Sequence, residues 1–158
     1  MGGSSWEYTV PFEVDVATTL AALHQQLFER EFADGWADLG ELRQDEEFMG
    51  NIGTHTILDV HRIVDSSDAP DWRSGDDYNT LRPLAPERIR HHFGTERPSR
   101  REYEALRAAQ QLPPFEPRTP QSPVTLDDEC QMRWTGRYLL LYDGAEPTDV
   151  AFWGYSGD

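Results

Sequence analysis

Residues 133–155 read RWTGRYLLLYDGAEPTDVAFWGY, and this stretch decides the fold that we expect. Residues 138–142 are apolar without a polar face, which is typical of a strand that is buried on both sides. Asp143 and Gly144 mark a turn, and residues 150–153 form a second apolar run. We therefore expect an antiparallel hairpin in the middle of a sheet, closed by a loop of about five residues.

The N-terminal part of the chain predicts a strand followed by a long helix. Residues 6–14 alternate apolar and polar side chains, as a half-buried strand does, and Pro11 favours a place at the sheet edge. Asp15 is the expected N-cap of a helix over residues 16–33. This helix has one apolar stripe that must lie on the sheet, formed by Val16, Leu20, Leu23 and Leu27.

The next part of the chain predicts a short acidic helix and a second strand. The helix is expected within residues 41–49, and the β-branched side chains of residues 54–64 favour the strand. His55, Asp59 and His61 would share one face of that strand. An extended chain separates them by about 13 Å and about 7 Å, which is too far for three ligands to close on one metal ion.

Two short helices are expected over about residues 85–112. Pro86 suits the first position of one helix, and Gly94 suits its end. Ser99 and Glu102 have the spacing of a capping box, which opens the other. His91 and His92 are adjacent on the first helix and point about 100° apart, so they are not expected to act as a pair.

These elements together predict one α+β domain over residues 6–158. Its sheet is expected to have four to five mostly antiparallel strands, with the 16–33 helix packed on a face. Residues 1–5 are expected to be a flexible N-terminus or a tag remnant. Residues 65–83 are expected to be an acidic loop, and the Pro-rich residues 112–123 an extended connector.

The charge of the chain restricts its partners. The formal net charge is −15, and all 14 basic residues are Arg. A GC-rich genome or a salt-adapted proteome would each explain the absence of Lys. Nucleic acids and anionic membranes need a basic surface, so this composition opposes both and is compatible with a basic protein partner.

The remaining chemical signals are weak. Cys130 is the single cysteine, and it follows three acidic residues that should raise its thiol pKa. The sequence lacks an apolar run of membrane-spanning length and a signal-peptide pattern, and we expect a soluble cytoplasmic protein. It also lacks a P-loop, a nucleophile elbow and a dinucleotide fingerprint. We expect no catalytic residues, cofactor or metal.

The acidic loop is the strongest candidate for function. Loops of this length without secondary structure are usually functional or disordered. Its carboxylates are suited to steering a basic partner, and its aromatic side chains are suited to anchoring one. The predicted partner-binding residues are Asp68, Asp71, Trp72, Asp76, Asp77 and Tyr78.

Three functions follow, with the oligomeric state left open. The first is a small acidic binding protein of the immunity or inhibitor type that neutralises a basic protein. The second is a small enzyme that uses carboxylates with His55 or His61 as acid and base. The third is an assembly subunit that pairs through its C-terminal strand.

Overall fold

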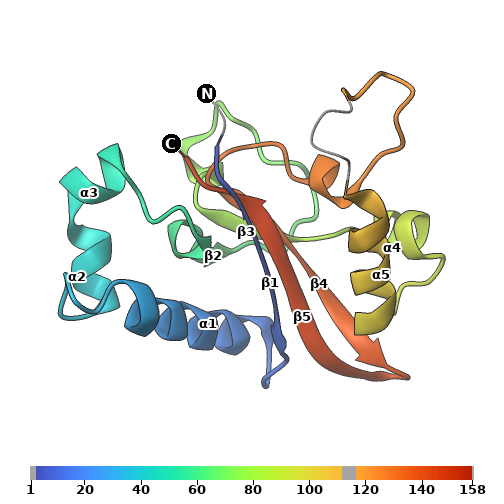
Figure 1. Ribbon diagram of the computed structural model, residues 1–158, viewed down its shortest axis with the longest axis horizontal. Helices are drawn as coiled ribbons and strands as arrows, with labels where there is room; N and C mark the ends of the chain where they lie inside the picture. The colour runs from blue at the N-terminus through green and yellow to red at the C-terminus, as the bar shows by residue number, and fades with distance from the viewer. Residues whose placement is uncertain (1–2, 112–116, 158) are drawn as a thin grey trace.

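The computed structural model describes residues 3–111 and 117–157, and it confirms the expected α+β fold (Figure 1). One five-stranded sheet has the order β1-β5-β4-β3-β2. Of the terminus expected to be flexible at residues 1–5, residues 1–2 lie outside the described residues and Ser5 belongs to the first strand. Of the connector expected over residues 112–123, residues 112–116 lie outside the described residues, and residues 117–123 form no helix or strand.

The sheet is mixed rather than mostly antiparallel. β5 (Glu146–Tyr155) pairs antiparallel with β1 (Ser5–Pro11) on one side and with β4 (Thr135–Asp143) on the other. β4 then pairs parallel with β3 (Thr80–Pro83), and β3 pairs parallel with β2 (Arg62–Ile63). The hairpin predicted from the C-terminal stretch is therefore confirmed, and it occupies the second and third positions of the sheet.

The hairpin turn is tighter than expected. Asp143 pairs with Glu146, so only Gly144 and Ala145 lie between the strands. Gly144 has a φ of 60°, a conformation that suits glycine in two-residue hairpin loops. The strands pair further towards the turn than the sequence suggested, and a register shift between Leu141 and Tyr142 leaves Thr148 as one extra residue in β5.

The first helix forms as predicted and the second is divided. α1 (Val16–Glu31) is capped by Asp15, whose Oδ1 accepts from the Thr18 amide at 2.7 Å. In place of one helix within residues 41–49 there are two, α2 (Leu39–Gln44) and α3 (Glu46–Asn51). Asp45 separates them, because its carboxylate accepts from the Phe48 amide and starts a new helix.

The two short helices of the second half make the crossover between β3 and β4. α4 (Pro86–Phe93) ends at Gly94, which has a φ of 72°, and α5 (Arg100–Gln110) begins with the predicted Ser99–Glu102 capping box. This helical connection returns the chain to the end of the sheet at which β3 starts, so β4 starts there too. This crossover is why β3 and β4 run parallel.

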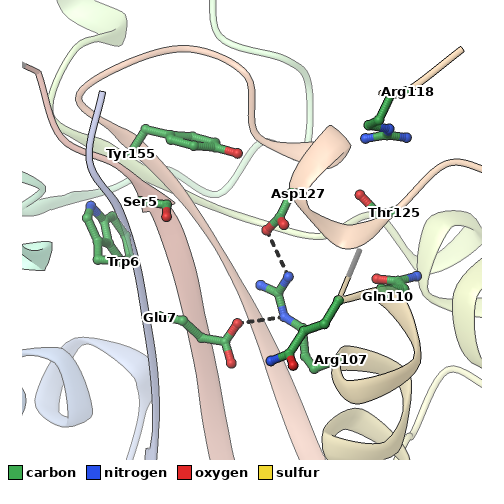
Figure 2. Close-up of a pocket in the computed structure, with 10 residues that line it drawn as sticks. Ser5, Trp6, Glu7, Arg107, Gln110, Arg118, Thr125, Asp127 and Tyr155 are labelled. Atoms are coloured by element: carbon green, nitrogen blue, oxygen red, sulfur yellow. Dashed lines mark hydrogen bonds and ion pairs between the residues drawn. The ribbon is translucent and has the colours of Figure 1, made fainter. Parts of the chain in front are cut away.

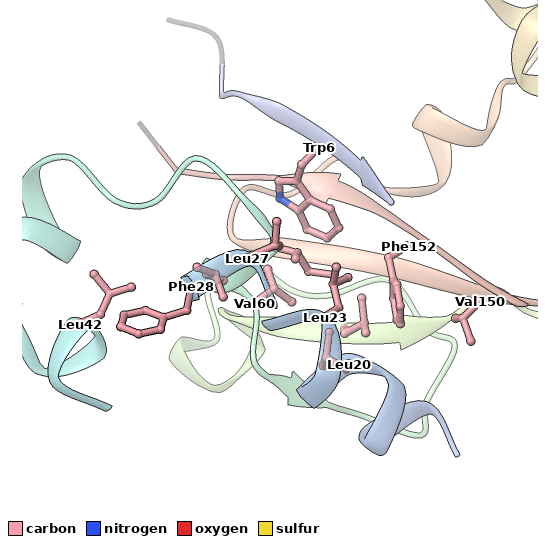
Figure 3. Packing of buried hydrophobic residues seen from close by; sticks show 12 residues of the cluster. Trp6, Leu20, Leu23, Leu27, Phe28, Leu42, Val60, Val150 and Phe152 are labelled. Atoms are coloured by element: carbon pink, nitrogen blue, oxygen red, sulfur yellow. The ribbon is translucent and has the colours of Figure 1, made fainter. Parts of the chain in front are cut away.

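Helices cover both faces of the sheet. α1 lies on one face, while α4 and α5 lie on the other (Figure 1). The core on the α1 side joins the stripe of α1 to Trp6, Val60 and Phe152 (Figure 3). The core on the α5 side joins Tyr103 to Trp153 and to the 3₁₀ turn at Leu126–Glu129. β4 and β5 contribute to both, as their unbroken apolar runs require.

The strand predicted over residues 54–64 is wrong except at β2. Ile57–Asp59 is a 3₁₀ turn, and the Asp59 carboxylate accepts from both the amide and the hydroxyl of Thr54. Such local side-chain bonds compete with a strand ladder. The stretch expected as an acidic loop also contributes secondary structure, because its last four residues form the buried strand β3.

We predict that Gly154→Ala destabilises the protein by about 1–3 kcal/mol. A methyl group there would lie against the Thr135 carbonyl oxygen and 2.5 Å from the Trp6 ring. Gly50→Ala is the matched control, because nothing lies within 4 Å of that position in α3. It should stabilise the protein by about 0.5–1 kcal/mol. Urea unfolding measures both, and equal midpoints for the two variants would contradict the close approach at Gly154.

Candidate functional site

The acidic loop is held in place by its own side chains. Asp77 accepts from the Asp71 amide and from the Arg82 guanidinium, both at 2.7 Å. The Tyr78 hydroxyl donates to the Trp72 carbonyl at 2.9 Å. Two of the predicted partner-binding residues, Asp77 and Tyr78, therefore position the loop.

The other predicted residues are presented outward. The Trp72 side chain is 66% exposed, and the Arg73 guanidinium lies 4.9 Å from the centre of its ring. Asp68, Asp71 and Asp76 are exposed. Among the described residues, these three carboxylates form no ion pair, since Arg82 and Arg62 reach only the backbone carbonyls of Asp68 and Asp76. The Asp71 carboxylate accepts from the Arg73 amide at 2.9 Å. An exposed indole and free carboxylates thus share one loop.

Beside this loop runs an open groove of about 590 Å³. One wall comes from the loop and the other from residues 128–134. Its aromatic side chains are Trp72, Tyr78 and Trp134, and the last two rings meet edge to face at 5.9 Å. We call this hollow the aromatic groove. The four predicted aspartates lie on the loop outside its lining.

Strand pairing brings the two walls of the aromatic groove together. Tyr78 lies two residues before β3 and Trp134 one residue before β4, and parallel strands start at the same edge of a sheet. The amide of Asn79 donates to the Trp134 carbonyl at 2.7 Å, just ahead of the Thr80–Thr135 pair. Asn79 and Trp134 both have positive φ angles, of 60° and 53°. The sequence analysis missed Trp134 because it missed β3.

The second wall of the aromatic groove carries carboxylates that already have partners. Arg118 holds Asp128 by two bonds, at 2.6 and 2.7 Å, and these bonds lower the pKa of that carboxyl. Glu129 accepts from Arg88 and His92. Burial alone would raise the pKa of Glu129, but these two partners outweigh it and the pKa is lowered. Both carboxylates are therefore ionised at neutral pH and fixed in place.

A second hollow, of about 540 Å³, lies between β1, α5 and the start of the 3₁₀ turn at Leu126–Glu129 (Figure 2). Arg107 stands at its centre and bonds to Glu7 at 2.7 Å and to Asp127 at 2.8 Å. The Arg107 guanidinium also donates to the Tyr103 hydroxyl. Glu7 and Asp127 balance the charge of Arg107, and the ion pair with Glu7 connects α5 to β1.

The histidines considered from the sequence lie apart. His55 bonds to Ser4, whereas His61 lies beside α1. Asp59 is buried and bound to Thr54, because the strand that would have aligned these three residues is absent. On α4, the His92 ring bonds to the Glu129 carboxylate, whereas His91 is exposed.

Cys130 is buried, and its environment agrees with the expected direction of its pKa. Burial is the main cause that raises the thiol pKa, and the negative charge of Asp127 adds to it. Among the described residues, no three His, Cys, Asp or Glu side chains gather as metal ligands would. No helix in the described ranges has the length and apolar character to cross a membrane.

His24 is a buried histidine that the sequence analysis did not single out. Its Nε2 bonds to the Ile57 carbonyl at 3.1 Å, and its Nδ1 faces an Arg43 nitrogen at 2.9 Å. Burial, followed by the positive charge of Arg43, lowers the pKa of His24 to about 4. The ring is therefore neutral at pH 7 and accepts from Arg43.

Comparison with protein families, with curated proteins and with solved structures finds no match to this chain.

We predict that the buried His24 makes the protein sensitive to mild acid. Its pKa is about 6.5 in an unfolded chain and about 4 in the fold, so the unfolded state binds the extra proton between these values. The free energy of unfolding should fall by about 2 kcal/mol between pH 7 and pH 5. Urea unfolding at both pH values measures this loss.

The control for this prediction is a pair of histidine variants. His24→Gln should remove most of the loss between pH 7 and pH 5, because its side chain does not titrate in that range. His91→Gln changes an exposed histidine of α4 and should leave the loss as in the wild type. An unchanged loss in His24→Gln would show that another group causes it.

Proposed function

We propose that this protein binds a basic protein partner through the aromatic groove and the free carboxylates of the acidic loop. In this role it would neutralise its partner, as an inhibitor or immunity-type protein does. The observation that carries the proposal is Trp72, which is 66% exposed beside an aromatic groove of about 590 Å³. A large exposed indole next to such a hollow has the character of an interface anchor.

The aromatic groove suits a cationic side chain. Three aromatic rings face it, and a guanidinium or ammonium over such a ring is attracted by the ring's negative face. Arg73 already lies over Trp72 in this way within the chain itself. A partner's Arg entering the aromatic groove would find the same kind of contact, with Asp128 and Glu129 along the opposite wall. Arg133 adds one basic side chain to this lining.

The two sets of carboxylates have different roles in this proposal. Asp77, Asp128 and Glu129 are engaged by arginines of the same chain, so they fix the shape of the aromatic groove. Asp68, Asp71 and Asp76 are exposed and available to pair with a partner's basic residues, although one oxygen of Asp71 also accepts from the Arg73 amide. Because the loop is ordered by its own bonds, binding would cost little conformational entropy. The net charge of −15 would steer association over a longer distance.

The two alternatives have less support. Acid–base catalysis would need a carboxylate beside His55 or His61. His61 lines a hollow beside α1 and burial lowers its pKa, but among the described residues no carboxylate lines that hollow, and His55 lies elsewhere, bonded to Ser4. Assembly through the C-terminal strand needs a free strand edge, but β5 is paired on both sides, with β1 and with β4. The proposal places the protein in the cytoplasm, where its single cysteine would stay reduced. The net charge of −15 opposes binding to nucleic acid.

We predict that reversal of the loop charges abolishes capture of the partner and that loss of the indole weakens it. The immobilised protein would be exposed to a lysate of its native host, beside the double variant Asp71→Arg/Asp76→Arg and the single variant Trp72→Ala. A basic protein retained by the wild type should be lost from the double variant. Trp72→Ala should weaken its binding by 2 kcal/mol or more, about thirtyfold.

The control is a second double variant with the same change of net charge. Glu13→Arg/Asp34→Arg alters two exposed acids away from the loop and should retain the partner. With the purified partner, the association rate should fall steeply as salt is added. Equal capture by the loop variant and the control variant, or an association rate that ignores salt, would refute the proposed binding surface.

A further inference from the structure

A third hollow lies on the α1 side of the sheet, between α1, α2 and β2. It has a volume of about 470 Å³, within the range of small-molecule sites. Its lining combines apolar and basic side chains, with Leu20, Leu39 and Ile63 among the former and His24, Arg43 and His61 as the latter. Among the described residues no carboxylate lines it, although the chain has 29 acidic residues.

Arg43 is the unusual residue of this hollow. Within the described residues its guanidinium contacts the ring of His24 and forms no ion pair, and its Nε is buried without a hydrogen-bond partner. A guanidinium has five N–H donors; one nitrogen of Arg43 contacts His24, and Nε is its one nitrogen found buried without a partner, so its remaining donors are open to solvent or to a ligand. Arg82 and Arg107 also each have one buried nitrogen without a hydrogen-bond partner, but their charges are paired, because Arg82 binds Asp77 and Arg107 binds two carboxylates. Arg137 donates to three backbone carbonyls.

The position of Arg43 is fixed by His24. The His24 Nε2–H donates to the Ile57 carbonyl, so Nδ1 is left to accept from Arg43. Neutral His24 therefore orients the guanidinium without balancing its charge. Burial and then the charges of Arg43 and Arg62 lower the pKa of His61, which agrees with an uncompensated positive potential in this hollow.

We propose that this hollow binds a small molecule with a carboxylate head and an apolar body, with the carboxylate on Arg43. A planar guanidinium offers two parallel N–H donors that match the two oxygens of a carboxylate. The side chains of Leu20, Leu39 and Ile63 would cover the apolar body. A phosphate group fits less well, because it calls for several donors and neutral His24 has both ring nitrogens engaged.

This site is independent of the aromatic groove, with which it shares no lining residue. The probe is octanoate, titrated into the full-length protein at pH 7 by calorimetry. The wild type should bind it, and Arg43→Gln should bind it about ten- to a hundredfold more weakly. Arg101→Gln is the matched control, because Arg101 is exposed on α5, and its affinity should equal that of the wild type.

A second variant tests the same site in case Arg43→Gln fails to fold. Ala21 is exposed on α1 and lines the same hollow, so Ala21→Glu would place a carboxylate of the chain itself next to Arg43. It should remain folded and lose octanoate binding. The neutral analogue 1-octanol should bind the wild type at least about tenfold more weakly than octanoate.

Several results would overturn the assignment. One is the absence of octanoate binding to the wild type at millimolar concentration, and another is equal binding to Arg43→Gln. Equal affinity for 1-octanol would show that the head group is not recognised. Displacement of octanoate by an equal concentration of inorganic phosphate would show that the site does not select a carboxylate.

Discussion

The parallel pairing of β3 with β4 is the contact on which the rest of the structure depends. It begins at Thr80 opposite Thr135 and joins the C-terminal hairpin to the part of the chain that carries β2 and the acidic loop. Because both strands start at the same edge, the residues just before them meet, and Tyr78 comes to lie against Trp134. The same pairing requires a helical crossover, which places α4 and α5 over the second face of the sheet.

The acidic composition serves the fold as well as any partner. Asp15, Asp38 and Asp45 each accept an amide at the start of a helix, where a negative charge is favoured by the helix dipole. Buried Asp59 replaces a strand ladder with bonds to Thr54. Many carboxylates are thus occupied within the molecule, and the free ones on the acidic loop are a smaller set than the net charge suggests.

Much of the fold could be predicted from the sequence because its signals are local. The apolar run of β4, the stripe of α1 and the Ser99–Glu102 capping box each lie within a few residues, and the structure confirms all three. The strand expected at residues 54–64 failed because β-branched side chains favour a strand only where a partner ladder is present. There, the bonds of Asp59 to Thr54 were stronger competitors.

Only one wall of the candidate site could be predicted from the sequence, because the other wall is brought to it by contacts between distant parts of the chain. Trp72 and Tyr78 could be found from their place in an acidic loop. Trp134 and Met132 line the aromatic groove although they follow these residues by more than fifty positions. They reach it through the pairing of β3, a strand of four residues. β3 could not be recognised from the sequence because it is short and contains the charged Arg82. The hollow around Arg43 forms where α1, α2 and β2 meet in space. It therefore could not be predicted from the spacing of residues in the sequence.

The pairing of the first strand with the last has a consequence for how the chain folds during synthesis. β1 begins at Ser5 and lies opposite Tyr155, so the chain from β1 to the end of β5 must leave the ribosome before this edge of the sheet can close. Until then Trp6 and the apolar stripe of α1 lack Val150 and Phe152, their partners in the core. Contacts between distant parts of a chain slow folding. We therefore expect the sheet to close only after β5 has been synthesised, with α1 as the segment that most needs protection until then.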